Sequence, residues 1–293
     1  MFPSENPAPL APPAPQHPDH AVSRLRTQRL AASAKPFLAR GSGGGRCAGC
    51  RLVASHCLCG LRPQVSTRAG VCLLMGDIEA LKPSNTGWLV ADVVADTWAF
   101  PWSRITVDPA LLELLADPQW QPYVVFPGEF VEAERVVTDL QTEESSDEAT
   151  APGAKKKPLF VLLDGTWSEA RKMFRKSPYL DRFPVLSLQP EAVVSNYRLR
   201  RSARENHFCT SEVAALCLAL AGETHAANTL AAWLDVFTER YLSVKGWTRL
   251  DPGSETHQRL QALAALGGQG AGEGEGEDAA GLIPRVSRLE PAA

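Results

Sequence analysis

PLFVLLDGTWSEARKMFRK, residues Pro158–Lys176, is the stretch that decides the fold. Its first part is the continuous apolar run Leu159–Leu163, which is typical of a strand covered on both faces of a sheet. Asp164 ends this run, and the pattern of Ser168–Lys176 predicts a helix. A buried strand followed directly by a helix indicates a unit of an α/β fold, with Asp164 at the carboxyl end of the strand.

Similar apolar runs recur along the chain and alternate with helical patterns. Further strands are predicted over Val71–Met75, Tyr123–Phe126 and Val185–Leu188, and further helices over Trp88–Ala95 and Ser211–Ala221. This alternation predicts an α/β fold with a largely parallel sheet. Open α/β sheets bind ligands at the carboxyl ends of their strands, so the residues after Leu163 are the first candidates for a site.

Composition sets the class of protein. A chain of 293 residues with 44% apolar residues is long enough to bury a sizeable core without disulfides. It has no apolar leader at its N-terminus and no run of about 18 apolar residues, so we expect a cytoplasmic protein that does not enter a membrane. Nothing in the sequence indicates an obligate protein partner.

Low-complexity segments divide the chain. Residues 1–45 have seven prolines before His20 and then a basic stretch, and we expect a disordered arm there. A surface insertion is expected at 142–157 and a disordered tail at 263–293. The remaining sequence forms a small cysteine-rich unit, 46–62, and a main domain, 63–262.

Four of the seven cysteines lie within 13 residues, as Cys47-x-x-Cys50 and Cys57-x-Cys59. Two close pairs of thiols suit a tetrahedral zinc site, and four cysteine ligands leave no open position for catalysis. We therefore predict a structural zinc knuckle. Four reduced thiols without metal are the alternative, and His56 could replace one of the cysteines as a ligand.

Three polar segments are candidates for ligand binding. KPSNTG, Lys82–Gly87, precedes a predicted helix, and its N-cap residues would present backbone N–H groups to an anion. Asp164-Gly-Thr-Trp167 lies at a predicted strand end. Asn206–Glu212 opens another helix, with Thr210 or Ser211 as its N-cap. Plain helix capping is the alternative explanation for all three segments.

Positive charge is concentrated in one part of the chain. The net charge is −3, yet the segment from Arg171 to Arg204 has nine basic and two acidic residues, a local charge of +7. Aromatic residues such as Phe174, Tyr179 and Tyr197 lie among them. Basic and aromatic side chains together favour contacts with the phosphates and bases of RNA, whereas a solvated helix face is the alternative.

These segments resemble, in the same order, the DTW-domain family, which is named after an Asp-x-Thr-Trp motif. The resemblance covers residues 46–247 and is strongest to bacterial tRNA-uridine aminocarboxypropyltransferases. It rests on the cysteine pairs, KPSNTG, QPYVVFPG at 121–128, DGTW, Tyr197-Arg-Leu-Arg200 and Thr210-Ser-Glu212. Two positions depart from the family pattern: Gly76-Asp77 replaces His-Pro, and Trp88 replaces Arg or Lys.

The resemblance implies a SPOUT-like α/β domain with a C-terminal trefoil knot. It also implies that the 3-amino-3-carboxypropyl group of S-adenosyl-L-methionine is transferred to N3 of a uridine in the tRNA variable loop. The products are acp3U and methylthioadenosine, and the displacement needs no metal.

The implied reaction, the positions near predicted strand ends and the concentration of positive charge together suggest a role for each candidate residue. Asp164 is expected to be the general base. The co-substrate is expected to contact Ser84, Asn85, Thr86, Gly87, Thr166, Trp167, Thr210 and Glu212. The tRNA is expected to contact Arg171, Lys172, Arg175, Lys176, Arg198 and Arg200.

Two other functions fit part of the sequence. A SPOUT methyltransferase would use the same co-substrate but release adenosylhomocysteine. A non-enzymatic zinc-knuckle RNA-binding protein would explain the cysteines and the basic residues, but not the acidic motif at a strand end.

Overall fold

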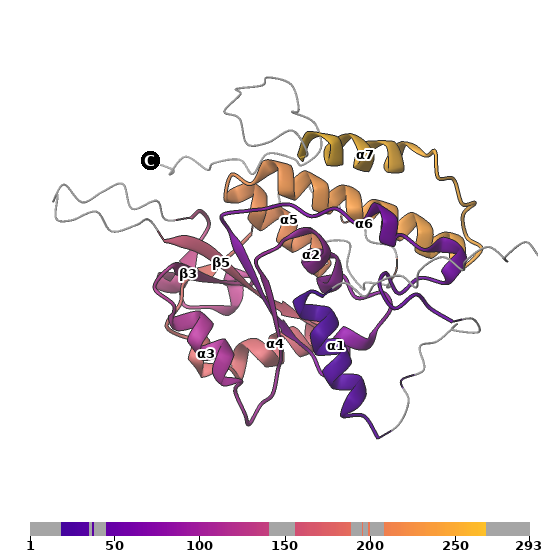
Figure 1. The fold of residues 1–293 in the computed structure, drawn as a ribbon. Helices are drawn as coiled ribbons and strands as arrows, with labels where there is room; N and C mark the ends of the chain where they lie inside the picture. Colours follow the sequence, from indigo (N-terminus) through magenta and orange to yellow (C-terminus); the bar gives the residue numbers. More distant parts are fainter. Residues whose placement is uncertain are drawn as a thin grey trace, which may run out of the picture.

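The computed structural model describes residues 19–34, 37, 45–140, 156–188, 195, 199 and 208–267. They form a parallel sheet with helices on both faces, so the predicted α/β fold is confirmed (Figure 1). The expected trefoil knot stays a prediction, because most of the connection between residues 188 and 208 lies outside the described residues. No helix in the described ranges has both the length and the apolar character needed to cross a membrane.

Six parallel strands form the sheet in the order β2-β1-β5-β3-β6-β4. Their bounds are β1 Gly70–Met75, β2 Thr97–Pro101, β3 Trp120–Val125, β4 Val136–Val137, β5 Lys157–Asp164 and β6 Val185–Leu186. The predicted strands correspond to β1, β3, β5 and β6, whereas β2 and β4 were not predicted. Strand β5 lies between β1 and β3, and Met75 pairs with Asp164 at its carboxyl end.

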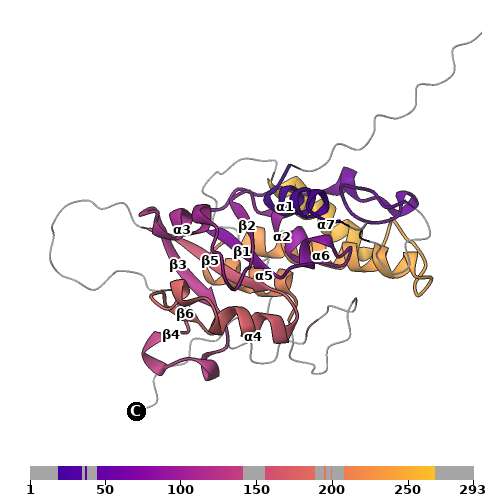
Figure 2. The same ribbon diagram turned by 90° about the horizontal axis from the view of Figure 1, so that it is seen from below.

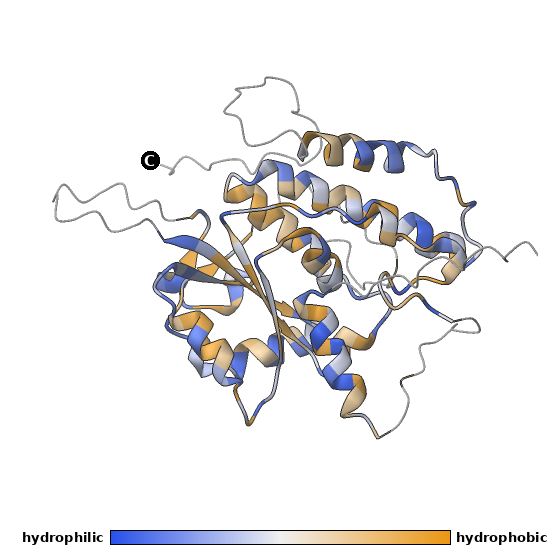
Figure 3. Cartoon of the chain, in the orientation of Figure 1, coloured by the Kyte–Doolittle hydropathy of each residue, from blue (hydrophilic) through white to orange (hydrophobic). Residues whose placement is uncertain are grey.

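Two helical layers cover the sheet. Helices α3 (Pro109–Ala116) and α4 (Trp167–Arg175) pack on one face, around apolar side chains such as Leu74 and Val161. The other face carries α2 (Gly87–Val93), α5 (Thr210–Leu220), α6 (Thr224–Val244) and α7 (Glu255–Gly267). Figure 2 shows α4 and α2 on opposite sides of the sheet, and Figure 3 shows apolar residues both in the strands and along the helices. Because α7 ends at Gly267, the prediction of a disordered tail was wrong for residues 263–267, and the rest of that segment lies outside the described residues.

A helix also lies in the N-terminal segment, where the sequence indicated a disordered arm. Helix α1, Ala21–Ala31, packs against the α2 side of the molecule with Val22 and Leu25 buried. His20 caps it by accepting a hydrogen bond from the backbone N–H of Ser23 at 3.1 Å. The prediction of disorder was therefore wrong for α1, because only two large apolar anchors distinguish this helix from a solvated basic segment.

Candidate functional site

Asp164 is the centre of the candidate site. It is the last residue of β5, and its side chain is buried, with 3% of the residue exposed. The Asn85 amide donates to one carboxylate oxygen at 2.7 Å, and the Thr210 hydroxyl donates to the other at 2.6 Å. Three segments that are distant in the sequence therefore meet at one carboxylate, as expected at the carboxyl ends of parallel strands.

The KPSNTG loop is shaped to approach this carboxylate closely. Asn85 uses its carbonyl oxygen to accept the backbone N–H of Trp88 in the first turn of α2 at 2.9 Å, while its amide binds Asp164. A Cβ atom at Gly87 would lie 2.5 Å from Oδ2 of Asp164. Only glycine lets the backbone come this near without displacing the carboxylate.

Arg51 binds the backbone of the KPSNTG loop, a role that the sequence did not predict. It is buried, with 2% of the residue exposed, and its Nη1 donates to the backbone oxygen of Asn85 at 2.9 Å. Its guanidinium lies 4.4 Å from the ring centroid of Trp88, which is a cation–π contact. Arg51 also has a φ of 66° and directly follows Cys50, so it connects the cysteine cluster to the Asp164 site. In the sequence, an arginine that follows a cysteine pair gives no indication that it will bind the backbone of a distant loop.

The start of α5 forms the other wall of the site. Its N-cap is Cys209, not Thr210 or Ser211 as expected. Glu212 accepts the backbone N–H of Cys209 at 2.7 Å and the hydroxyl of Ser195 at 2.9 Å. Burial raises the pKa of the Cys209 thiol above its ordinary value, so it stays protonated at neutral pH. The Ser211 hydroxyl is fully buried and has no hydrogen-bond partner among the described residues.

Thr166 and Trp167 have partners elsewhere. Thr166 is the N-cap of α4 and forms a reciprocal capping box with Glu169. Trp167 stacks on Phe126, with 5.6 Å between ring centroids and an interplanar angle of 10°. The hydrogen bonds to the Asp164 carboxylate described above therefore come from Asn85 and Thr210 and not from these two residues.

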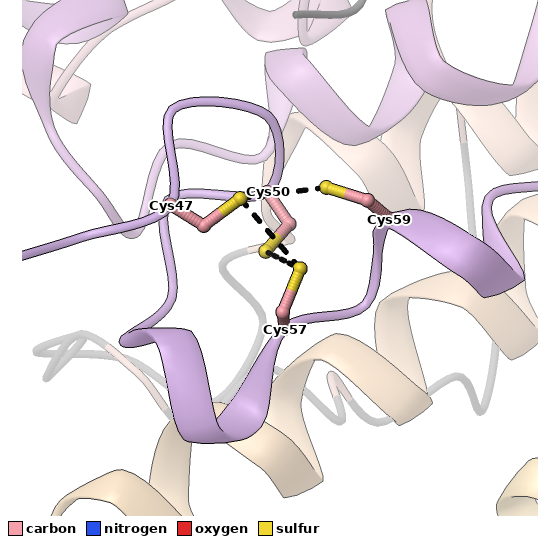
Figure 4. Close-up of side chains that lie close together, drawn as sticks. All are labelled: Cys47, Cys50, Cys57 and Cys59. Atoms are coloured by element: carbon pink, nitrogen blue, oxygen red, sulfur yellow. Dashed lines mark hydrogen bonds between the residues drawn. The ribbon is translucent and has the colours of Figure 1, made fainter. Parts of the chain in front are cut away.

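The four cysteines form a compact cluster (Figure 4). Their sulfur atoms all lie within 4.8 Å of one another, and three of the separations are 3.5, 3.6 and 3.8 Å. A tetrahedron of thiolates around zinc, with Zn–S bonds of about 2.3 Å, needs S···S distances of about 3.8 Å. The cluster therefore fits a closed zinc site. His56 is not part of it, because its ring nitrogens contact the hydroxyls of Ser55 and Ser243.

Four of the predicted RNA-contacting residues lie together on the exposed side of α4. They are Arg171, Lys172, Arg175 and Lys176, and none has an acidic partner among the ion pairs of the described residues. Arg198 and Arg200 lie outside the described residues. The helix thus presents a positive surface that begins next to the Asp164 site.

The two departures from the family pattern both contact α1. Arg29 binds the carboxylate and the backbone oxygen of Asp77. The His20 ring packs edge-on against Trp88, with 4.6 Å between ring centroids. Arg26 of the same helix donates to the backbone oxygen of Leu81 at 2.6 Å, directly before the KPSNTG loop. Helix α1 therefore braces the segment that carries Asn85.

A comparison with protein-family models matches residues 44–242, more than half of the chain, to the model described as DTW domain. This range contains the cysteine cluster, the KPSNTG loop, Asp164 and the start of α5, but not α1. No solved structure matches the chain.

Proposed function

Since the chain belongs to the DTW-domain family, we propose that it is a tRNA-uridine aminocarboxypropyltransferase, close in function to the bacterial enzymes it resembles. Family membership is consistent with an enzyme that modifies tRNA. The observation that carries the finer proposal is the buried Asp164 carboxylate, which Asn85 and Thr210 hold at the carboxyl edge of the sheet. We further propose that the domain has the SPOUT-like topology and knot implied by the resemblance.

Asp164 would act as the general base. The N3–H bond of uridine must break before N3 can attack, and a positioned carboxylate is able to accept that proton. N3 then forms a bond to the γ-carbon of the methionine moiety, the C–S bond breaks, and its electron pair remains on sulfur in methylthioadenosine. The sulfonium is already a good leaving group, so the remaining task of the protein is to align nucleophile, carbon and sulfur.

The walls around Asp164 would hold S-adenosyl-L-methionine. One wall is the loop of Ser84, Asn85, Thr86 and Gly87, and the other is the start of α5 with Thr210 and Glu212. The orphaned hydroxyl of Ser211 supports this placement, since a buried polar group without a partner is costly unless a ligand or water satisfies it. The N-terminus of α5 favours a negatively charged group such as the carboxylate of the co-substrate.

RNA would bind along α4, where the three basic residues of the helix and its C-cap residue Lys176 can contact successive phosphates. The cysteine cluster would hold a zinc ion that has no chemical role, because all four positions are filled by protein. Its contribution is to fix the turn that carries Arg51, and through Arg51 the backbone of Asn85.

The test is mass spectrometry of nucleosides from unmodified tRNA after incubation with the protein and S-adenosyl-L-methionine, with the nucleoside by-product measured in parallel. We expect acp3U and methylthioadenosine from the wild type, at least about 100-fold less product from Asp164→Asn, and an unchanged rate for the exposed control Asp181→Asn. A methylated base with adenosylhomocysteine would identify a methyltransferase instead. Binding of tRNA without any binding of the co-substrate would favour a non-enzymatic RNA-binding protein.

A further inference from the structure

Four aromatic rings form a continuous cluster at the start of α4. Phe126 stacks on both Trp167 and Phe174, with centroid distances of 5.6 and 4.3 Å and interplanar angles of 10° and 6°. Phe130 packs edge-on against Trp167 at 6.2 Å. We call these four rings the aromatic platform.

The platform leaves aromatic surface open to solvent. Trp167 is 40% exposed and Phe130 is 37% exposed, whereas Phe126, which contacts both rings, is 5% exposed. The two exposed residues are neighbours, with 6.2 Å between their ring centroids. Isolated exposed apolar side chains need no explanation, but adjoining aromatic ones mark binding sites.

Rigid elements hold the platform beside the Asp164 site. Trp167 and Phe174 share one face of α4 at i and i+7, and the capping box of Thr166 and Glu169 fixes the first turn of that helix. Phe126 follows β3, which pairs directly with β5, the strand that ends in Asp164. The platform and the buried carboxylate are therefore built on adjacent strands at the same edge of the sheet.

Charge around the platform indicates what it binds. The guanidinium of Arg171 lies 4.7 Å from the ring centroid of Phe130, and Lys172, Arg175 and Lys176 continue the positive surface along α4. Flat aromatic surface next to a row of cations suits a ligand that alternates planar rings with phosphates. Single-stranded nucleic acid has this chemistry.

We propose that the aromatic platform stacks a nucleobase of the RNA substrate, while Arg171 contacts an adjoining phosphate. This inference adds a contact of the RNA to the proposed function, and it depends on that function only for the identity of the ligand as tRNA. The position of Trp167 just after the carboxyl end of β5 instead predicts a contact with the co-substrate, so the adenine ring of S-adenosyl-L-methionine is the competing occupant. The two occupants can be distinguished by measuring the binding of each ligand in the absence of the other.

The test compares equilibrium binding of fluorescently labelled, unmodified tRNA with calorimetric binding of S-adenosyl-L-methionine. Trp167→Leu keeps an apolar side chain against Phe126 but removes the flat ring, and Trp167→Phe keeps a smaller ring. We expect tRNA affinity to fall about 10-fold in Trp167→Leu, in the range found for the loss of one stacked base, and by less than about 3-fold in Trp167→Phe. Affinity for the co-substrate should not change in either variant. Trp247→Leu is the control, since Trp247 is 71% exposed and lies outside the family match.

Unchanged tRNA affinity in Trp167→Leu would overturn the inference, and so would a loss of co-substrate affinity with tRNA affinity retained. Thermal unfolding checks that the variants fold. Because binding is measured without turnover, the result does not depend on which base is modified. A wild type that binds and stacks tRNA but yields no acp3U would contradict the proposed function and leave the platform standing.

Discussion

Replacing Gly87 with alanine adds a single methyl group to the candidate site, and its effect can be worked out from the structure. The new Cβ would lie 2.5 Å from Oδ2 of Asp164, whereas such contacts are essentially never shorter than 3.0 Å. The carboxylate or the loop must therefore move by at least 0.5 Å. The same oxygen accepts the 2.7 Å hydrogen bond from Asn85, so the shift strains that bond directly.

The expected cost appears in both stability and activity. Overpacking of this kind costs about 1–3 kcal/mol, which lowers Tm by roughly 3–10 °C in a domain of this size. Displacing a catalytic group by about 1 Å can reduce turnover about 100-fold, so a shift of half that size should reduce kcat by about 10-fold or more. The assay is run well below Tm, where this loss of stability unfolds little of the protein. The reduction in kcat should therefore be larger than unfolding alone explains.

Gly60→Ala is the matched control, because a Cβ at Gly60 has nothing within 4 Å. Turnover is followed by release of methylthioadenosine from S-adenosyl-L-methionine and tRNA, and stability by thermal unfolding. A kcat of Gly87→Ala within about 2-fold of that of Gly60→Ala would show that the close approach of this loop to Asp164 does not matter for catalysis. That result would refute the claim that the KPSNTG loop holds a catalytic carboxylate in place.

Three further outcomes follow from the geometry. Cys50→Ser should abolish binding of one zinc per chain, measured by elemental analysis, and lower Tm by more than about 6 °C; equal metal content in variant and wild type would exclude the cysteine cluster as the site. Arg26→Ala should raise KM for the co-substrate or lower kcat by about 3-fold or more, because it removes the hydrogen bond to the backbone oxygen of Leu81. The control Arg24→Ala loses only an exposed pair with Asp19 and should leave KM and kcat unchanged. Burial and the neighbouring Arg240 lower the pKa of His257, so the unfolded chain takes up a proton more readily than the folded one. The stabilisation of the folded state by neutral His257 should be fully present above about pH 6.5 and should fall at lower pH. His257→Gln should flatten this dependence in urea unfolding measured from pH 5 to 8.

The sequence was most informative where one physical signal dominates. Strands β1 and β5 are buried on both faces and read as unbroken apolar runs, so they were predicted closely. Strand β2, Thr97–Pro101, lies at an edge of the sheet, is only partly buried and ends in proline, so its pattern is weak. Helix α1 was missed for a similar reason, since tertiary contacts rather than periodicity hold it.

The candidate site shows the same division. The position of Asp164 at a strand end could be predicted from the chain direction of a parallel sheet, but its partners could not. Asn85 and Thr210 are 79 and 46 residues away in the sequence, and only the folded sheet brings them together. Arg51 depends on three long-range contacts at once, to the backbone of Asn85 and to the rings of Trp88 and Phe237, and a single sequence carries no record of such contacts.

The place of β5 in the sheet affects how the protein must be made. Strands β1 to β4 precede it in the chain, yet β5 separates β1 from β3, and its first pairing with β1 joins Gly70 to Leu159. During synthesis on the ribosome, β1 and β3 therefore emerge with an unfilled position between them and with their hydrogen-bonding edges unpaired. Such edges attract other chains, and long-range parallel pairing is slow. The growing chain is thus most prone to aggregate before residue 164 has emerged, and the strand that joins β1 to β3 is the one that delivers Asp164 to the site.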